Sequence, residues 1–197
     1  MLNELKDNDV KNFVNDSMIQ IKYMSKTLSD FRNFLKPSTK KVLFSISKAL
    51  NEINEIIGKQ VFYSNINMNF NYKNKNEELL IYGYENEFKQ VLLNIINNAK
   101  NKIVEKNLPL NKKGEININI QRCENCNMIE IIDDAGAIDE KIINSIFEPY
   151  FTTKENGMGL GLYMAKIIIE DKMKGTISVR NDKNCVIFTI KLPFKKA

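Results

Sequence analysis

Isoleucine alternates with other residues in two neighbouring segments, 116–120 and 129–131, and this period of two restricts the fold more than any other feature. Successive side chains of a strand point to opposite faces of a sheet, so the alternation predicts strands with one buried and one solvated face. Residues 123–126 join the segments and predict a hairpin turn. The buried face of such a sheet needs helices to cover it.

Helical periodicities and shorter alternations indicate the other elements. We expect helices over about 38–57, 85–106, 140–146 and 160–173, and further strands over 66–70, 79–82, 176–180 and 186–192. These elements do not alternate as strict βαβ units. The sequence therefore predicts an α+β fold, a two-layer α/β sandwich whose mixed sheet is covered by helices on one face and preceded by a long bundle-type helix.

Two interleaved seven-residue series predict that first helix. They are Val10, Ser17, Met24 and Phe31, and Val14, Ile21, Leu28 and Leu35. The spacing is typical of the a and d positions of bundles, and a helix of about 26 residues would be about 39 Å long and need a partner. The pattern favours a homodimer through residues 10–35 over an ordinary amphipathic surface helix.

The junction at residues 36–39 is the predicted domain boundary, with one domain over 1–37 and the other over 38–197. Pro37 ends the first helix, and Ser38 is expected to cap the next one. The apolar stripe of that second helix consists of Val42, Ile46, Leu50, Ile53 and Ile57.

Composition excludes several kinds of chemistry. The 197 residues include no histidine, which rules out imidazole bases, imidazole metal ligands and Ser-His or Cys-His pairs within the chain. Cys123 and Cys126 predict a hairpin turn rather than a zinc site, because a single further cysteine leaves the tetrahedral set incomplete. The net charge of +5 comes from dispersed lysines, which does not indicate nucleic-acid binding. No apolar run approaches a membrane span, so we expect a soluble cytosolic chain.

Four short segments carry candidate chemistry. Gly157, Gly159 and Gly161 open a helix, where backbone N–H groups can surround a polyphosphate, although a purely structural turn would use the same residues. Asn94 and Asn98 share one face of an apolar helix; their amide oxygens suit Mg²⁺, and a capping or inter-helix hydrogen bond is the alternative.

The other two segments lie between these. Asp133 ends a buried strand, where its carboxylate can accept a hydrogen bond from a purine amine, and the small residues after it let a flat ring approach the backbone. Residues 147–154 form an aromatic-rich irregular stretch that leads into the glycines.

Taken in order, the four segments resemble the motifs of the catalytic and ATP-binding domain of bacterial sensor histidine kinases, in the superfamily that includes gyrase and Hsp90. They look like its N box (94–99), G1 box (133–138), F box (147–154) and G2 box (157–162), and the match covers 38–194. The first helix, with its Asp30–Phe34 segment, looks like the second helix of the dimerisation and histidine-phosphotransfer hairpin.

This resemblance implies an enzyme, a histidine kinase that binds ATP and Mg²⁺ and transfers the γ-phosphoryl group to a histidine. Asn98 would bind the metal and Asn94 would face the phosphates, these two being the catalytic residues. Asp133 would bind the adenine amine. The remaining residues implied at the nucleotide are Ala135, Gly136, Ala137, Ile138, Phe147, Thr153, Lys154, Gly157, Met158, Gly159, Leu160, Gly161 and Leu162. Phe147, Thr153 and Lys154 would shape a short lid.

The implied partners are ATP, a response regulator protein and a histidine-bearing helix of the same or a partner subunit. The implied location is the cytosolic portion of a sensor kinase. The phosphoacceptor histidine and its helix are absent from this chain, so autophosphorylation in cis is not expected.

Two further departures from the family pattern leave alternatives open. Ala135 and Ala137 stand where the G1 box has glycines. A positive φ at either would cost about 1 kcal/mol or more, and an added methyl group would crowd the adenine, so weaker nucleotide binding is expected. Asn94 stands where hydrolysing members carry a glutamate base, which favours a kinase over a hydrolase. The alternatives are a nucleotide-binding module with impaired catalysis, and an ATP-driven clamp or anti-sigma-type serine kinase.

Overall fold

The computed structural model describes residues 12–15, 17–18, 21, 38–73, 77–106, 109, 112–154 and 157–193. It divides into two compact units, 1–36 and 37–197. In the first unit the described residues are helical, and Phe13, Val14, Met18 and Ile21 are exposed. The other heptad positions, apart from Ser17, and the Asp30–Phe34 segment lie outside the described residues, so the bundle helix stays a prediction.

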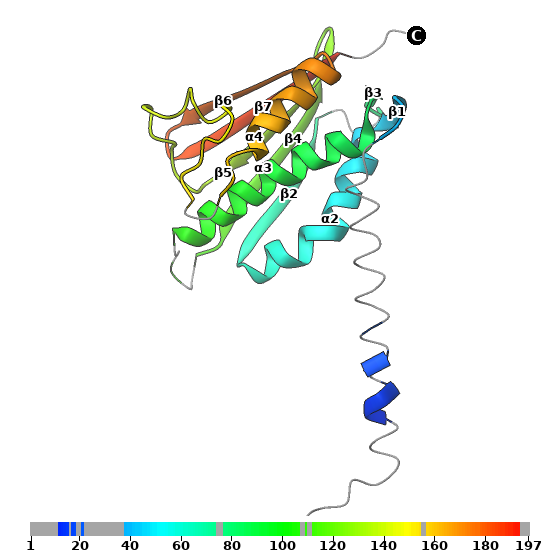
Figure 1. The fold of residues 1–197 in the computed structure, drawn as a ribbon, viewed down its shortest axis with the longest axis vertical. Coiled ribbons are helices and arrows are strands. Elements are labelled where there is room, and N and C mark those ends of the chain that lie inside the picture. Colours follow the sequence, from blue (N-terminus) through cyan, green and yellow to red (C-terminus); the bar gives the residue numbers. More distant parts are fainter. Residues whose placement is uncertain are drawn as a thin grey trace, which may run out of the picture. The chain divides into compact units, whose positions relative to one another are not determined.

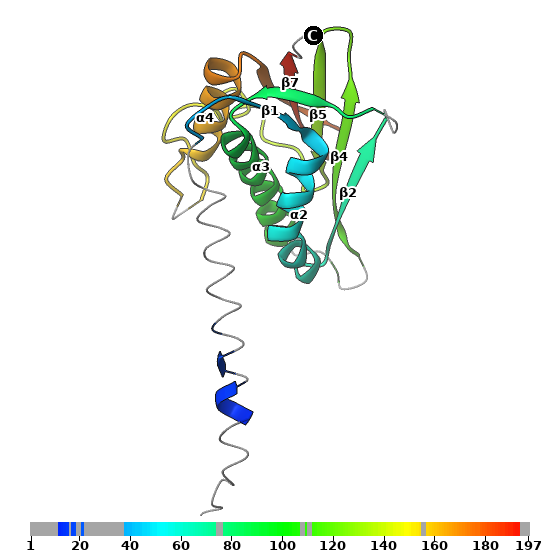
Figure 2. The same ribbon diagram turned by 90° about the vertical axis from the view of Figure 1, so that its right-hand side faces the viewer.

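The second unit is a two-layer sandwich (Figures 1 and 2). Its five-stranded sheet has the order β2-β4-β5-β7-β6, in which β2 and β4 are parallel and the other neighbours antiparallel, while β1 and β3 pair separately. Helices cover one face of the large sheet, which confirms the predicted fold class. The elements are β1 (Val42–Ser45), α2 (Ile46–Tyr63), β2 (Ile66–Tyr72), β3 (Leu80–Gly83), α3 (Glu85–Glu105), β4 (Gly114–Arg122), β5 (Cys126–Asp133), α4 (Gly161–Lys166), the π-helix η1 (Ile167–Lys172), β6 (Thr176–Asp182) and β7 (Cys185–Pro193).

The alternating isoleucines of β4 and β5 form the floor of the core. All five of them are fully buried, and the register pairs Ile118 with Ile131 and Ile120 with Ile129. The opposite face carries amides, among which Asn69 donates to Asn117 over 3.1 Å. One buried and one solvated face is what the period of two predicted. The predicted turn between the strands is also confirmed, since the Cys123 N–H donates to the Cys126 carbonyl over 2.7 Å.

The second helix starts later than predicted. Residues 42–45 form strand β1 against β3, and α2 begins at Ile46 with Ser45 as its N-cap. The run Val42-Leu43-Phe44 suits a strand, and β3, far along the chain, supplies the pairing that a local pattern cannot indicate. The prediction that Ser38 caps this helix is therefore wrong, whereas the rest of the predicted stripe, from Ile46 to Ile57, is buried.

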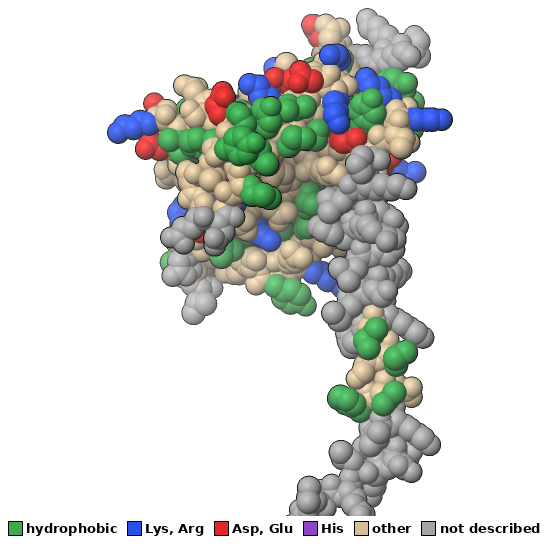
Figure 3. Space-filling view, in the orientation of Figure 1, with side chains coloured by type: hydrophobic (Ala, Val, Ile, Leu, Met, Phe, Trp, Pro, Cys, Tyr) green, Lys and Arg blue, Asp and Glu red, His purple; other side chains and the backbone are tan. Residues whose placement is uncertain are grey.

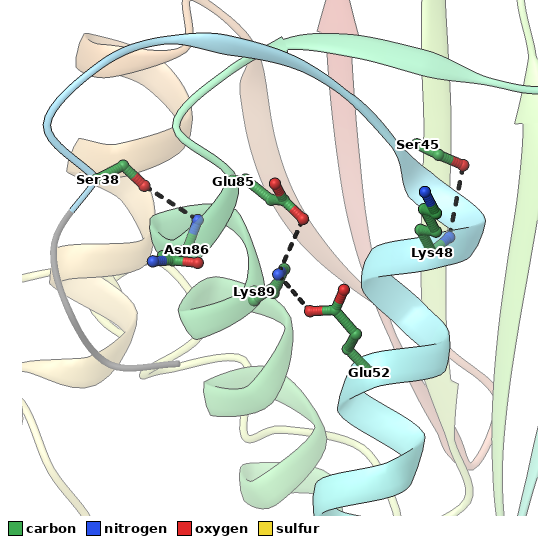
Figure 4. A network of polar contacts seen from close by, with 7 residues as sticks. All are labelled: Ser38, Ser45, Lys48, Glu52, Glu85, Asn86 and Lys89. Carbon is green, nitrogen blue, oxygen red and sulfur yellow. Dashed lines mark hydrogen bonds and ion pairs between the residues drawn. The ribbon is translucent and has the colours of Figure 1, made fainter. Parts of the chain in front are cut away.

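Ser38 instead caps the N-terminus of α3 (Figure 4). Its Oγ accepts a hydrogen bond from the Asn86 N–H, and its own N–H donates to Glu87 Oε2, both over 3.2 Å. Tyr84, the residue at the N-cap position of α3, provides no side-chain cap. Ser38 and Glu87 thus approximate a capping box across 49 residues of sequence, except that Ser38 Oγ accepts the N–H of Asn86, one residue before Glu87.

A buried ion cluster joins α2 to α3 close to this cap. Lys89, whose side chain is 7% exposed, pairs with Glu85 over 2.9 Å and also with Glu52 of α2 (Figure 4). Burial lowers the pKa of Lys89, but the hydrogen bonds and charges of the two glutamates outweigh this effect and raise the pKa above its ordinary value. Removing both glutamates would leave the buried ammonium of Lys89 uncompensated, whereas removing one leaves it the other as a partner.

Two predicted helices differ from the observed structure. Residues 140–146 form successive turns rather than a helix. Asp139 Oδ1 accepts the Lys141 N–H, and the N–H groups of Ile142 and Ser145 each donate to the carbonyl three residues earlier. The predicted helix over 160–173 is α4 continued by η1, whose widened last turn has the Met173 N–H donating to the Ile168 carbonyl. Hydrophobic side chains gather on the outer side of α4 and η1 (Figure 3), and Met164 there is 44% exposed.

The cap supplied by Ser38 can be measured as stability. Ser38→Ala removes the acceptor for the Asn86 N–H and should lower the free energy of unfolding by about 1 kcal/mol in urea titrations of the 1–197 chain. The exposed neighbour Thr39 gives the matched control, since Thr39→Ala loses a hydroxyl of the same kind without a cap. Equal losses from the two variants would contradict the assignment.

Candidate functional site

A cavity of about 420 Å³ lies between α3, the end of β5, the loop 134–160 and the start of α4. Side chains from all four predicted motifs line it, together with β7. A second cavity of about 480 Å³, between the end of α2 and β2, contains none of the predicted site residues. The cavity on α3 is therefore the candidate site.

The two asparagines of α3 enter this cavity side by side. Asn94 and Asn98 both line it, whereas Asn97 does not, as the helical spacing predicted. The Asn94 Nδ2 group is buried and has no hydrogen-bond partner among the described residues. Gly161 packs directly on this amide, so that a Cβ at position 161 would collide with Asn94 Oδ1. An unsatisfied buried donor costs about 1–3 kcal/mol, which a ligand acceptor would recover.

Lys154 reaches the same helix from the loop. Its Nζ donates a hydrogen bond to Asn98 Oδ1 over 3.0 Å. The ammonium thus lies directly beside the amide oxygen of Asn98. The backbone N–H of Lys154 is itself held by Thr152 Oγ1 over 3.1 Å.

Two adjacent aspartates end β5 with opposite orientations. Asp133 is 4% exposed and lines the cavity, where its Oδ1 accepts the Ala135 N–H over 3.1 Å. Burial raises the pKa of Asp133 to about 6, against a smaller lowering by that hydrogen bond. Asp134 Oδ1 instead accepts the Glu115 N–H over 2.9 Å and extends the β4–β5 pairing.

The turn after Asp134 has its one glycine at the position with a left-handed backbone. Gly136 has a φ of +104°, whereas neither Ala135 nor Ala137 has a positive φ. The expectation of backbone strain at the two alanines is therefore wrong, because the left-handed position falls between them. Asn181 of β6 fixes the turn from outside by accepting the Ile138 N–H over 2.9 Å and donating to its carbonyl over 2.8 Å.

Gly159 is the glycine on which the loop before α4 depends. It has a φ of +66°, and a Cβ there would collide with the carbonyl group of Tyr150. Tyr150 is itself left-handed, with a φ of +65°. The F-box and G2-box segments therefore contact each other backbone to backbone at this point, which excludes any side chain at position 159.

Most predicted site residues lie together, and three do not reach the cavity. Met158 is 79% exposed, Leu160 is the N-cap residue of α4, and Phe147 packs its ring against Phe188, which does line the cavity. Lining residues that were not predicted are Ala99, Lys102, Asp139, Ile142, Ile146, Phe151, Thr152, Val186 and Phe188. Lys102 follows Asn98 by four residues and could have been found from helical spacing, but nothing local marks the β7 residues.

Comparison with known proteins identifies the site. The model of the family described as histidine kinase-, DNA gyrase B-, and HSP90-like ATPase matches residues 83–196, which include all four motifs. The chain belongs to this ATPase family. This chain is 30% identical over 171 residues to sporulation kinase A of Bacillus subtilis, covering 85% of this chain and 27% of that kinase.

Solved structures agree with this assignment. The nucleotide-free catalytic domain of the histidine kinase ThkA has a TM-score of 0.67 and 28% identity over 79% of this chain and 96% of that one. A complex of ThkA with the response regulator TrrA matches 98% of this chain and 53% of the kinase at 23% identity, with a TM-score of 0.66. The resemblance to the ATPase domain of sensor histidine kinases is confirmed. The chain spans 27 to 42% of the length of sporulation kinases A to D.

The raised pKa of Asp133 predicts a pH-dependent penalty in the ligand-free domain. The pKa of Asp133 in the folded state, about 6, exceeds the ordinary 3.8. The contribution of this carboxyl to the free energy of unfolding is therefore most favourable below pH 3.8 and is lost as the pH rises to 6. Asp133→Asn should therefore be more stable than the wild type above pH 6, by up to about 3 kcal/mol, with the difference shrinking towards pH 4. Urea unfolding across this range tests it, and the same profile in Asp134→Asn would contradict it.

The two left-handed glycines should differ in what an alanine costs. Gly136→Ala should lose about 1 kcal/mol from φ alone, since no atom lies within 4 Å of its Cβ position. Gly159→Ala should lose more, because the collision with Tyr150 adds to the φ cost. Ala137→Gly should bring no gain in stability. Thermal unfolding of the three variants decides this order, which a larger loss at 136 than at 159 would overturn.

Proposed function

We propose that this domain binds ATP with Mg²⁺ in the cavity on α3 and donates the γ-phosphoryl group to a histidine carried by another segment or subunit. The observation that carries the proposal is the convergence of Asn94, Asn98, Asp133 and the Gly159 turn on one cavity. ATP binding and a kinase role are already supported for the family to which the chain belongs. The residue roles below are the proposed part.

The residues present fit a metal–nucleotide complex. Asn98 Oδ1 already accepts a hydrogen bond from a cation, the Lys154 ammonium, and amide oxygens are ligands that Mg²⁺ accepts. The unpartnered Nδ2 of Asn94 can donate to a phosphate oxygen. The N–H groups of residues 158–161, beside the start of α4, can do the same, because the glycines there leave the backbone accessible, whereas the Gly157 N–H already donates to the Lys154 carbonyl. Mg²⁺ would neutralise phosphate charge when bound.

Asp133 would recognise the base. Its buried carboxylate lines the cavity, and above pH 6 it is mostly ionised, so that it can accept a hydrogen bond from the adenine amine. The ring would lie along Ala135, Gly136, Ala137 and Ile138, whose position Asn181 holds through two hydrogen bonds. A partner for Asp133 would offset the cost of burying its charge.

Asn94 favours transfer to an acceptor over hydrolysis. In this position an amide can orient a phosphate oxygen but cannot take a proton from water, so a water nucleophile is poorly activated. In the transfer the γ-phosphorus exchanges its bond to the leaving ADP oxygen for a bond to an imidazole nitrogen. The chain contains no histidine, so the imidazole must come from elsewhere, and phosphorylation of this polypeptide on histidine is not expected.

The remaining proposals concern the first unit and the partners. We assign residues 1–37 to the second helix of a dimerisation and phosphotransfer hairpin, with a homodimer through residues 10–35, and 38–197 to the kinase domain. A response regulator would receive the phosphoryl group, and the domain would work in the cytoplasm. Within the part of the chain that the structure describes, no helix is long and apolar enough to span a membrane.

A catalytically impaired nucleotide-binding module is the second candidate. It rested on backbone strain at Ala135 and Ala137 and on crowding of the adenine by their methyl groups, and the ordinary backbone conformation of both alanines removes the first of these grounds. The clamp and serine-kinase alternatives have no specific observation in their favour.

Calorimetric titration with ATP tests the metal assignment. Asn98→Ala should abolish most of the affinity that depends on Mg²⁺ and leave the metal-independent part, which relies on Asp133. The matched control is Asn97→Ala, which removes the same side chain from a neighbouring position that does not line the cavity. The proposal fails if ATP does not bind the wild-type chain, and the metal role fails if the two variants behave alike.

A further inference from the structure

We propose that Lys154 acts as a latch on the metal-binding oxygen of Asn98 in the nucleotide-free domain. In this arrangement the ammonium must leave before a divalent cation can bind at Asn98. The inference rests on the proposed function, which supplies the metal, and it adds a residue that controls when the metal binds.

The contact is built by the backbone rather than by a freely moving lysine. Thr152 Oγ1 accepts the Lys154 N–H over 3.1 Å, and the Lys154 carbonyl accepts the Gly157 N–H over 3.2 Å. These bonds hold the backbone of Lys154, from which the side chain extends to α3. Lys154 is half-buried, and it forms no ion pair with a carboxylate among the described residues. The polar partner of its side chain is the amide oxygen of Asn98.

Two cations cannot share this oxygen favourably. A divalent ion on Oδ1 would stand within a few ångströms of the ammonium in a partly buried cavity, where repulsion is screened less than in water. The lysine and the metal therefore compete. A nucleotide changes the balance, since its phosphates offer the displaced ammonium a stronger, negatively charged partner.

The consequence is selection of the metal–nucleotide complex over the free metal. Without phosphates, the Lys154 ammonium stays hydrogen-bonded to the amide oxygen of Asn98. With phosphates the ammonium is released and the amide oxygen becomes available. Lys154 is thus a positioning residue that makes metal binding at Asn98 depend on the nucleotide.

Lys102 provides a matched control for charge. It also lines the cavity, but its Nζ pairs with Glu105 over 2.7 Å instead of contacting Asn98. Lys102→Met and Lys154→Met remove the same charge from the same cavity. If the two lysines act only by adding positive electrostatic potential to the cavity, both substitutions should strengthen metal binding equally.

The test uses Mn²⁺ alone and paramagnetic broadening of backbone amide signals around Asn98 in the 1–197 chain. Lys154→Met should reach half-maximal broadening at a Mn²⁺ concentration at least about threefold lower than the wild type, while Lys102→Met stays near it. In the metal-free protein, the side-chain NH₂ signals of Asn98 should move in Lys154→Met and not in Lys102→Met.

Equal effects in the two variants, or no change in Lys154→Met, would overturn the latch. Binding of ADP with Mg²⁺ to the wild-type chain is measured separately by calorimetry. Absence of that binding contradicts the proposed function, whereas the nucleotide-free comparisons decide the latch by themselves.

Discussion

The packing of α3 against the isoleucine face of the sheet is the interaction on which the rest of the structure depends. Leu92, Ile95 and Ile96 of α3 are fully buried, and α3 contacts both β4 and β5, so the burial of its apolar residues sets the rotation of the helix. Once the rotation is fixed, Asn94 and Asn98 point towards the cavity. The cap from Ser38 and the ion cluster around Lys89 define where the helix begins, so the same burial that stabilises the domain also places its polar face.

The ligand-free cavity keeps several polar groups without good partners. Asp133 carries a raised pKa because it is buried, the Nδ2 group of Asn94 has no partner among the described residues, and Lys154 pairs with a neutral amide. Each arrangement costs free energy that a metal–nucleotide complex would return. Such local violations of polar satisfaction are expected where a domain is built for binding rather than for maximal stability.

The G1 turn differs from the family pattern in the positions of its glycines. The glycine of this chain stands between the two positions where the family pattern has glycines, and there it takes the left-handed conformation. Alanines on either side remain in ordinary conformations. Nucleotide binding should therefore be judged from the backbone at Gly136 and from the hydrogen bonds of Asn181, not from agreement with the pattern.

The sequence by itself determined the sheet with one buried face, the α+β class and the order of the four motifs, because periods of two and 3.6 are local properties. It also placed Asn94 and Asn98 on one helix face. Only the tertiary structure decided that residues 42–45 form a strand, that Ser38 caps α3, and that Val186 and Phe188 of β7 close the cavity. These contacts join residues far apart in the chain. The periodicity of a segment reports only its own secondary structure and does not indicate which distant segment it will contact.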